Sequence, residues 1–107
     1  MRRLFLKQKY LNYILEGKKT LEGRVGYDNI RRFKIGDYVY LNGKYKAQIV
    51  GIRKYSTFAE ALSEENYKLL IPDANSIKEA IEVYNNLYPL WKQKNFGVYI
   101  FEIKYPV

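Results

Sequence analysis

The dipeptide Asn42-Gly43 constrains this chain more than any other feature, because it lies between two runs of residues that favour β-strands. A two-residue type I′ turn needs positive φ at both central residues, which asparagine and glycine tolerate best. The flanking runs, 38–41 and about 45–52, are rich in tyrosine, valine and isoleucine. The sequence therefore predicts an antiparallel β-hairpin here.

Two helix starts follow the hairpin. Thr57 with Glu60 and Ser76 with Glu79 each form a capping box, in which a hydroxyl and a carboxylate satisfy free backbone amides. An apolar stripe at helical spacing then continues from the second box to Pro89, which ends the helix. The full pattern predicts strands at 3–6, 20–25, 38–41, 45–52 and 98–105, helices at 9–16, 57–70 and 76–88, and a basic loop at 26–34.

The mixed order of these elements predicts an α+β fold. A length of 107 residues suits one domain, and 48% hydrophobic residues are enough for a core. A small sheet hides its edges most simply by closing on itself. We therefore expect residues 1–107 to form a single domain, with a small curved sheet or barrel that carries helices.

Cysteine and histidine are both absent, which excludes disulfides, thiolate nucleophiles, cysteine-based zinc sites and the commonest general base. Catalysis, if any, would use lysine, arginine, carboxylates or hydroxyls. We expect no metal and no cofactor. The chain has no apolar run near the roughly 18 residues of a membrane helix, and its first residues do not resemble a signal peptide. These observations predict a cytoplasmic protein that does not contact the membrane.

Positive charge is concentrated in the first half of the chain. Residues 1–55 contain 14 lysines and arginines against 4 acidic residues, whereas residues 56–107 contain 5 against 7. Such an asymmetry is typical of proteins that bind a polyanion, above all nucleic acid. A lysine-rich surface like that of thermophilic proteins is the alternative interpretation.

Several basic residues of this half lie near aromatic side chains that can stack on bases. The residues predicted to contact nucleic acid are Arg2, Arg3, Lys18, Arg31, Arg32 and Lys34.

The densest polar stretch, 17–24, reads GKKTLEGR. On a strand, Glu22 and Arg24 share one face about 6–7 Å apart, and Lys19 precedes the strand and turns toward them. A carboxylate between two cations stays ionised and suits the binding of a base or phosphate, or proton transfer. A structural ion pair is the alternative. Because Glu22 opposes the effect of burial on Lys19, we expect Lys19 to remain a cation that anchors a ligand.

The stretch 17–24 resembles the G-x-K-x-x-E-x-R signature of the ASCH domain, a family within the PUA-like superfamily. Residues 33–39 resemble the segment that begins the barrel hairpin in PUA-like proteins. The resemblance implies a small PUA-like β-barrel of five or six mixed strands with two to four flanking helices. It also implies a cleft, lined by Lys19, Glu22 and Arg24, that binds ligand. It also implies RNA binding, in RNA processing or translation-related regulation.

One bacterial branch of this family is an amidohydrolase that deacylates acetylcytidine, and the resemblance implies such an activity as the alternative function. Lys19 then matches the catalytic lysine, Glu22 stands where that branch has threonine, and Asp73 is the approximate counterpart of the catalytic glutamate. A closed pocket around Lys19 would favour this enzyme, and an open groove continuous with the basic residues would favour extended RNA. The expected partner is accordingly RNA or a nucleoside. A protein-interaction adaptor is a third interpretation.

Overall fold

The hairpin predicted around Asn42-Gly43 is confirmed in the computed structural model, which describes residues 2–107. Strands β3 (Tyr38–Leu41) and β4 (Tyr45–Tyr55) pair antiparallel across it. Asn42 and Gly43 have φ angles of 51° and 70°, as the turn requires. β4 is longer than predicted because residues 53–55 still pair with the last strand of the chain, beyond a register irregularity between Ile49 and Gly51.

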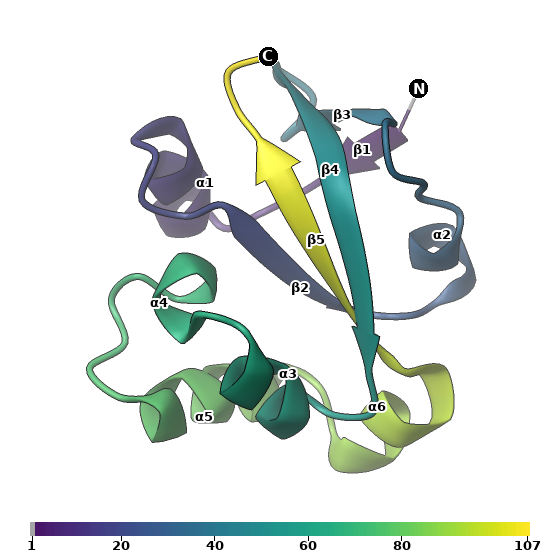
Figure 1. Cartoon of the computed structure of the whole chain (residues 1–107), viewed down its shortest axis with the longest axis vertical. Helices are drawn as coiled ribbons and strands as arrows, with labels where there is room; N and C mark the ends of the chain where they lie inside the picture. The colour runs from purple at the N-terminus through teal and green to yellow at the C-terminus, as the bar shows by residue number, and fades with distance from the viewer. Residues whose placement is uncertain (1) are drawn as a thin grey trace.

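The five strands form one mixed sheet in the order β1-β3-β4-β5-β2. β1 (Arg2–Leu4) runs parallel to β3, and β2 (Leu21–Val25) and β4 both pair antiparallel with β5 (Val98–Lys104). The sheet curls into half of a barrel (Figure 1). This confirms the α+β class, and it leaves β1 and β2 as the two edge strands of the described sheet.

Both capping boxes are confirmed. The hydroxyls of Thr57 and Ser76 accept hydrogen bonds of 3.1 Å from the backbone N–H groups of Glu60 and Glu79. The predicted segment 57–70 divides in two, because the side chain of Asn66 starts a new helical turn by accepting from the Lys68 N–H.

The described residues contain six helices, and the expected number of two to four was therefore wrong. Two short ones, inside the predicted basic loop and directly after Pro89, lack the long apolar periodicity on which the prediction relied. The helices are α1 (Gln8–Leu15), α2 (Asp28–Arg31), α3 (Phe58–Glu64), α4 (Tyr67–Leu70), α5 (Ile77–Leu87) and α6 (Leu90–Phe96).

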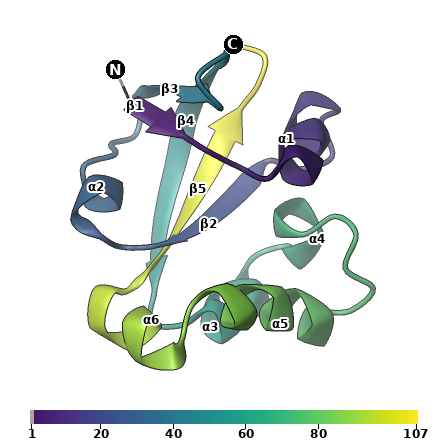
Figure 2. The same cartoon turned by 180° about the vertical axis from the view of Figure 1, so that it is seen from behind.

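The sheet separates two hydrophobic clusters. One joins the sheet to α1 and α2, and the other joins it to α3, α4 and α5. β5 contributes to both, because Phe101 belongs to the first cluster and Ile100 to the second. Figures 1 and 2 show α3 and α5 below the sheet, α4 beside it below α1, and α2 on the same side of the molecule as β1. This arrangement brings the first residues of the chain and α5 to the free edge of β2.

Candidate functional site

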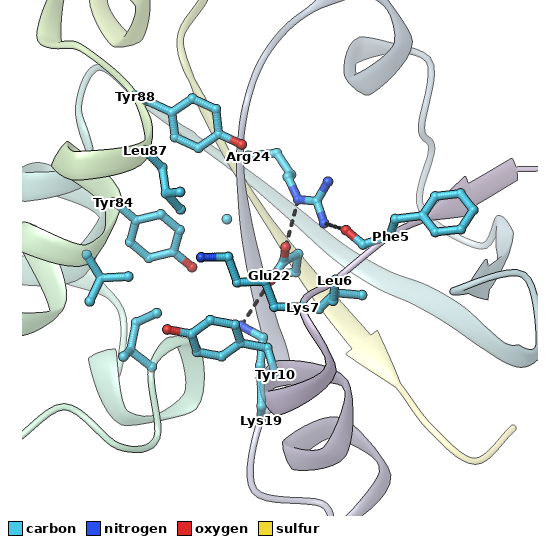
Figure 3. Close-up of a pocket in the computed structure, with 13 residues that line it drawn as sticks. Phe5, Leu6, Lys7, Tyr10, Lys19, Glu22, Arg24, Tyr84, Leu87 and Tyr88 are labelled. Carbon is cyan, nitrogen blue, oxygen red and sulfur yellow. Dashed lines mark hydrogen bonds and ion pairs between the residues drawn. The ribbon is translucent and has the colours of Figure 1, made fainter.

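A cavity of about 170 Å³ lies at the free edge of β2 (Figure 3). It is bounded by β2, by the connection from β1 to α1, and by α5. Its lining residues are Phe5, Leu6, Lys7, Tyr10, Lys19, Glu22, Gly23, Arg24, Ile71, Val83, Tyr84, Leu87 and Tyr88. The structure therefore brings Lys19, Glu22 and Arg24 into one cavity, as the motif suggested.

Lys19 is buried and surrounded by three acceptors. Its Nζ lies 3.0 Å from Glu22 Oε1 and donates to the carbonyl oxygens of Leu21 at 2.5 Å and Leu70 at 2.6 Å. An ammonium has three N–H donors, so all of them are used. Lys19 thereby satisfies the carbonyl of an edge strand and ties β2 to α4.

The pKa of Lys19 is lowered, because burial disfavours the charged form more than Glu22 supports it. We expected Glu22 to raise the pKa of Lys19 by more than burial lowers it, and this expectation was wrong. Three acceptors nevertheless match an ammonium, whereas a neutral amine would direct a lone pair at one of them. We conclude that Lys19 is a cation with no donor left for a ligand.

Glu22 lies between the two cations. Arg24 Nε donates to Glu22 Oε2 at 2.7 Å, opposite the contact with Lys19. Burial raises the pKa of Glu22, but Lys19 and Arg24 together outweigh it and hold that pKa below its ordinary value. The carboxylate is therefore ionised at neutral pH, and each oxygen keeps acceptor capacity for a ligand.

Arg24 also holds the connection between β1 and α1. Its Nη2 donates to the Phe5 carbonyl at 2.7 Å, which leaves the N–H groups of Nη1 for other contacts. The predicted common face of Glu22 and Arg24 is confirmed by their ion pair. Arg24 thus connects the carboxylate to the opposite side of the cavity.

Aromatic side chains surround this polar cluster. Tyr84 and Tyr88 come from α5, and the Tyr84 ring stacks on Phe58 with 4.2 Å between centroids. Gly23 makes that approach feasible, because a Cβ there would lie 2.9 Å from Phe58 Cε1. Burial raises the pKa of Tyr84 well above its ordinary value, so its hydroxyl stays protonated. Phe5, with 63% of its surface exposed, lies on the opposite side of the cavity.

Lys7 is a cavity residue that the sequence analysis missed. Its side chain points into the cavity, with the ammonium toward α5 (Figure 3). Among residues 2–107 it belongs to none of the ion pairs. The only signal in the sequence was its place in a basic N-terminal segment directly before a helix. Lys7 has the free ammonium that was expected of Lys19.

Asp73 is not brought to this cluster. It does not line the cavity, and its carboxylate pairs with Lys9 Nζ at 2.9 Å on the exposed surface. Lys19 and Glu22 are therefore together, and the third member of the predicted catalytic set lies apart from them. Within residues 2–107, no cluster of three or more acidic residues is arranged to hold a metal ion.

The predicted nucleic-acid residues divide into groups. Arg2, Arg3 and Arg32 line a second depression of about 180 Å³. Arg31 donates to the backbone carbonyls of Gly26 at 2.8 Å and Phe96 at 3.0 Å, so it joins the segment after β2 to the last residue of α6.

Two further residues of that set lie elsewhere. Lys18 is exposed, 3.8 Å from a carboxylate oxygen of Glu16, and Lys34 is exposed on the loop before β3. The six residues are thus dispersed over the surface, and none of them lines the cavity.

Nearly the whole described chain matches the model of a known domain. The model of the ASCH domain covers residues 4–107. The chain belongs to the ASCH domain family. It shares 36% identity with hypothetical protein PH0355, whose crystal structure superposes with a TM-score of 0.91 over 97% of this chain and 98% of that one.

A second solved structure of an ASCH-like protein has the same fold. The solution NMR structure of protein PF0455 from Pyrococcus furiosus is 35% identical, with a TM-score of 0.81 over 96% of this chain and 94% of that one. No curated protein matches the chain. Residues 2–107 include no helix that is long and apolar enough to cross a membrane.

Proposed function

We propose that this ASCH domain binds single-stranded RNA and takes one unstacked base into the cavity at the edge of β2. The observation that supports this best is the ionised Glu22 beside Arg24, enclosed by aromatic side chains. Proteins that read single-stranded RNA stack splayed bases on aromatic rings and hydrogen-bond to their edges. The association of the ASCH family with RNA agrees with this proposal.

The polar groups favour a base with an exocyclic amino group. Glu22 accepts hydrogen bonds, while Arg24 Nη1 and the Lys7 ammonium donate them. Cytosine presents an amino donor next to a ring acceptor, and carboxylates accept from that amino group. Uracil would place a carbonyl oxygen against Glu22. We therefore propose that the cavity prefers cytosine to uracil.

The state of Lys19 favours binding over hydrolysis. A lysine that acts as a general base needs an available lone pair, and one that anchors a ligand needs an available N–H. Lys19 has neither while it contacts Glu22, Leu21 and Leu70. We propose that it positions Glu22, and deacylation of acetylcytidine remains the alternative to be tested.

The experiment is a titration of the protein with short oligocytidine and oligouridine RNA at low salt. Glu22→Gln should weaken binding of oligocytidine about tenfold, because one good base contact contributes that much discrimination. Glu82→Gln, which removes a carboxylate from the exposed side of α5, is the matched control and should bind normally. A folded Glu22→Gln variant with wild-type affinity would overturn the proposal. Release of acetate from acetylcytidine by the wild type would favour the hydrolase.

A further inference from the structure

We propose that the depression between β1 and α2 is a separate phosphate-binding site, which holds a backbone phosphate of the RNA strand whose base enters the cavity. The RNA part of this inference rests on the proposed function. The site itself is inferred from its own residues, Arg2, Arg3, Asn29, Arg32 and Phe33. β1 and α2 lie on the same side of the molecule in both views (Figures 1 and 2).

The chemistry of the depression suits a phosphate. Three of its five lining residues are arginines, and none of the five has a carboxylate. A guanidinium offers a planar fork of N–H donors that matches phosphate oxygens in pairs. Asn29 adds an amide donor at the same place. An anion there would meet donors of two kinds.

Arg2 is already held in position. Its Nε donates to Asp37 Oδ2 at 3.0 Å, and its guanidinium lies 5.4 Å from the centroid of the Phe33 ring. Both contacts restrict the side chain and leave its two terminal nitrogens for a ligand. Asp37 is itself fixed, because the same oxygen accepts from the Lys34 N–H at 2.9 Å. A positioned arginine loses little conformational entropy when it binds.

Arg3 and Arg32 supply uncompensated charge. Both are exposed, and neither takes part in an ion pair among residues 2–107. Asp37 offsets only the charge of Arg2. The depression therefore keeps a local excess of positive charge, which attracts an anion most strongly at low salt.

The first residues of the chain connect this depression to the cavity. Arg2 and Arg3 line the depression, and Phe5, two residues after Arg3, lines the cavity. In extended chain this separation is about 7 Å. Arg24 fixes the connection by bonding to the Phe5 carbonyl, and the exposed Phe5 ring offers a stacking surface between the two sites. An RNA strand bound in the depression thus passes close to the cavity.

The test compares Arg3→Ala/Arg32→Ala with Lys78→Ala/Lys94→Ala, which removes the same charge from exposed positions on α5 and α6. Oligocytidine binding is measured across a salt series. Loss of the one phosphate held in the depression should reduce the slope of log K against log salt by about 0.7 in the arginine variant. Cytidine without a phosphate should bind that variant as it binds the wild type. A slope equal to that of the lysine control would overturn the inference.

A second arm separates this inference from the proposed function. Pyrophosphate is titrated at low salt while the side-chain N–H resonances of the arginines are followed by NMR. We expect Arg3 and Arg32 to shift and Arg53, which is already paired with Glu65 and Glu102, to stay unchanged. Selective shifts in a protein that binds no RNA would support the phosphate site and overturn the proposed function. Equal shifts at all three arginines, or none, would overturn the site.

Discussion

The side-chain amide of Asn42 forms two hydrogen bonds with the backbone of Leu6. The Leu6 N–H donates to Oδ1 at 2.8 Å, and Nδ2 donates to the Leu6 carbonyl at 3.0 Å. Leu6 lines the cavity, whereas Asn42 belongs to the hairpin turn 36 residues away. The residue that makes the turn feasible therefore also positions one side of the candidate site.

Replacing Asn42 separates its two roles. Asn42→Gly keeps the positive φ but loses both bonds to Leu6, and should lower the free energy of unfolding by about 1–2 kcal/mol. Asn42→Ala loses the same bonds and adds the strain of positive φ, so it should be the less stable variant. Denaturant unfolding measures both. Equal stability of Asn42→Gly and the wild type would show that the bonds to Leu6 contribute nothing.

Lys19→Met should be strongly destabilising, by about 3 kcal/mol, because it leaves two buried carbonyls and one side of Glu22 without a partner. Lys9→Met is the matched control. Its ion pair with Asp73 is exposed, so its removal should change stability by less than about 1 kcal/mol. Similar losses in the two variants would contradict the structural role of Lys19.

Stability should fall in acid because two carboxylates have lowered pKa values. Arg53 holds the pKa of Glu65 below its ordinary value, and the cations around Glu22 do the same there. Below about 4.5, the ordinary value, the unfolded chain takes up protons that the folded protein resists, so the free energy of unfolding decreases as pH falls.

The measurement is unfolding by denaturant at a series of pH values between 3 and 7. Glu65→Gln removes one of the two groups, so its stability should depend less steeply on pH than that of the wild type. A wild-type stability that stays constant through this range would contradict the lowered pKa values.

Lys7→Ala should weaken RNA binding without weakening the fold. The side chain is exposed, makes no ion pair within residues 2–107, and extends into the cavity. We expect a change in unfolding free energy below about 0.5 kcal/mol, as for ordinary surface substitutions. RNA affinity, measured by titration beside Lys78→Ala, should fall several-fold further than in that control. Equal affinities would remove Lys7 from the site.

Local rules were enough for much of the fold. A turn type depends on the φ angles of two adjacent residues, and a capping box on groups three residues apart. The common face of Glu22 and Arg24 follows in the same way from the two-residue period of a strand. The short helices α2 and α6 were not predicted, because four to seven residues are too few to show the apolar periodicity of a helix.

What the sequence alone determined about this protein was therefore the hairpin, the main helix starts, the basic half of the chain and the pairing of Glu22 with Arg24. The tertiary structure decided the state of the site. One donor of Lys19 contacts the carbonyl of Leu70, 51 residues away, and the others contact Glu22 and the Leu21 carbonyl, so none is left for a ligand. Asp73 pairs with Lys9 and does not line the cavity. Burial and hydrogen-bond partners depend on which distant segments meet, and spacing along the chain does not contain that information.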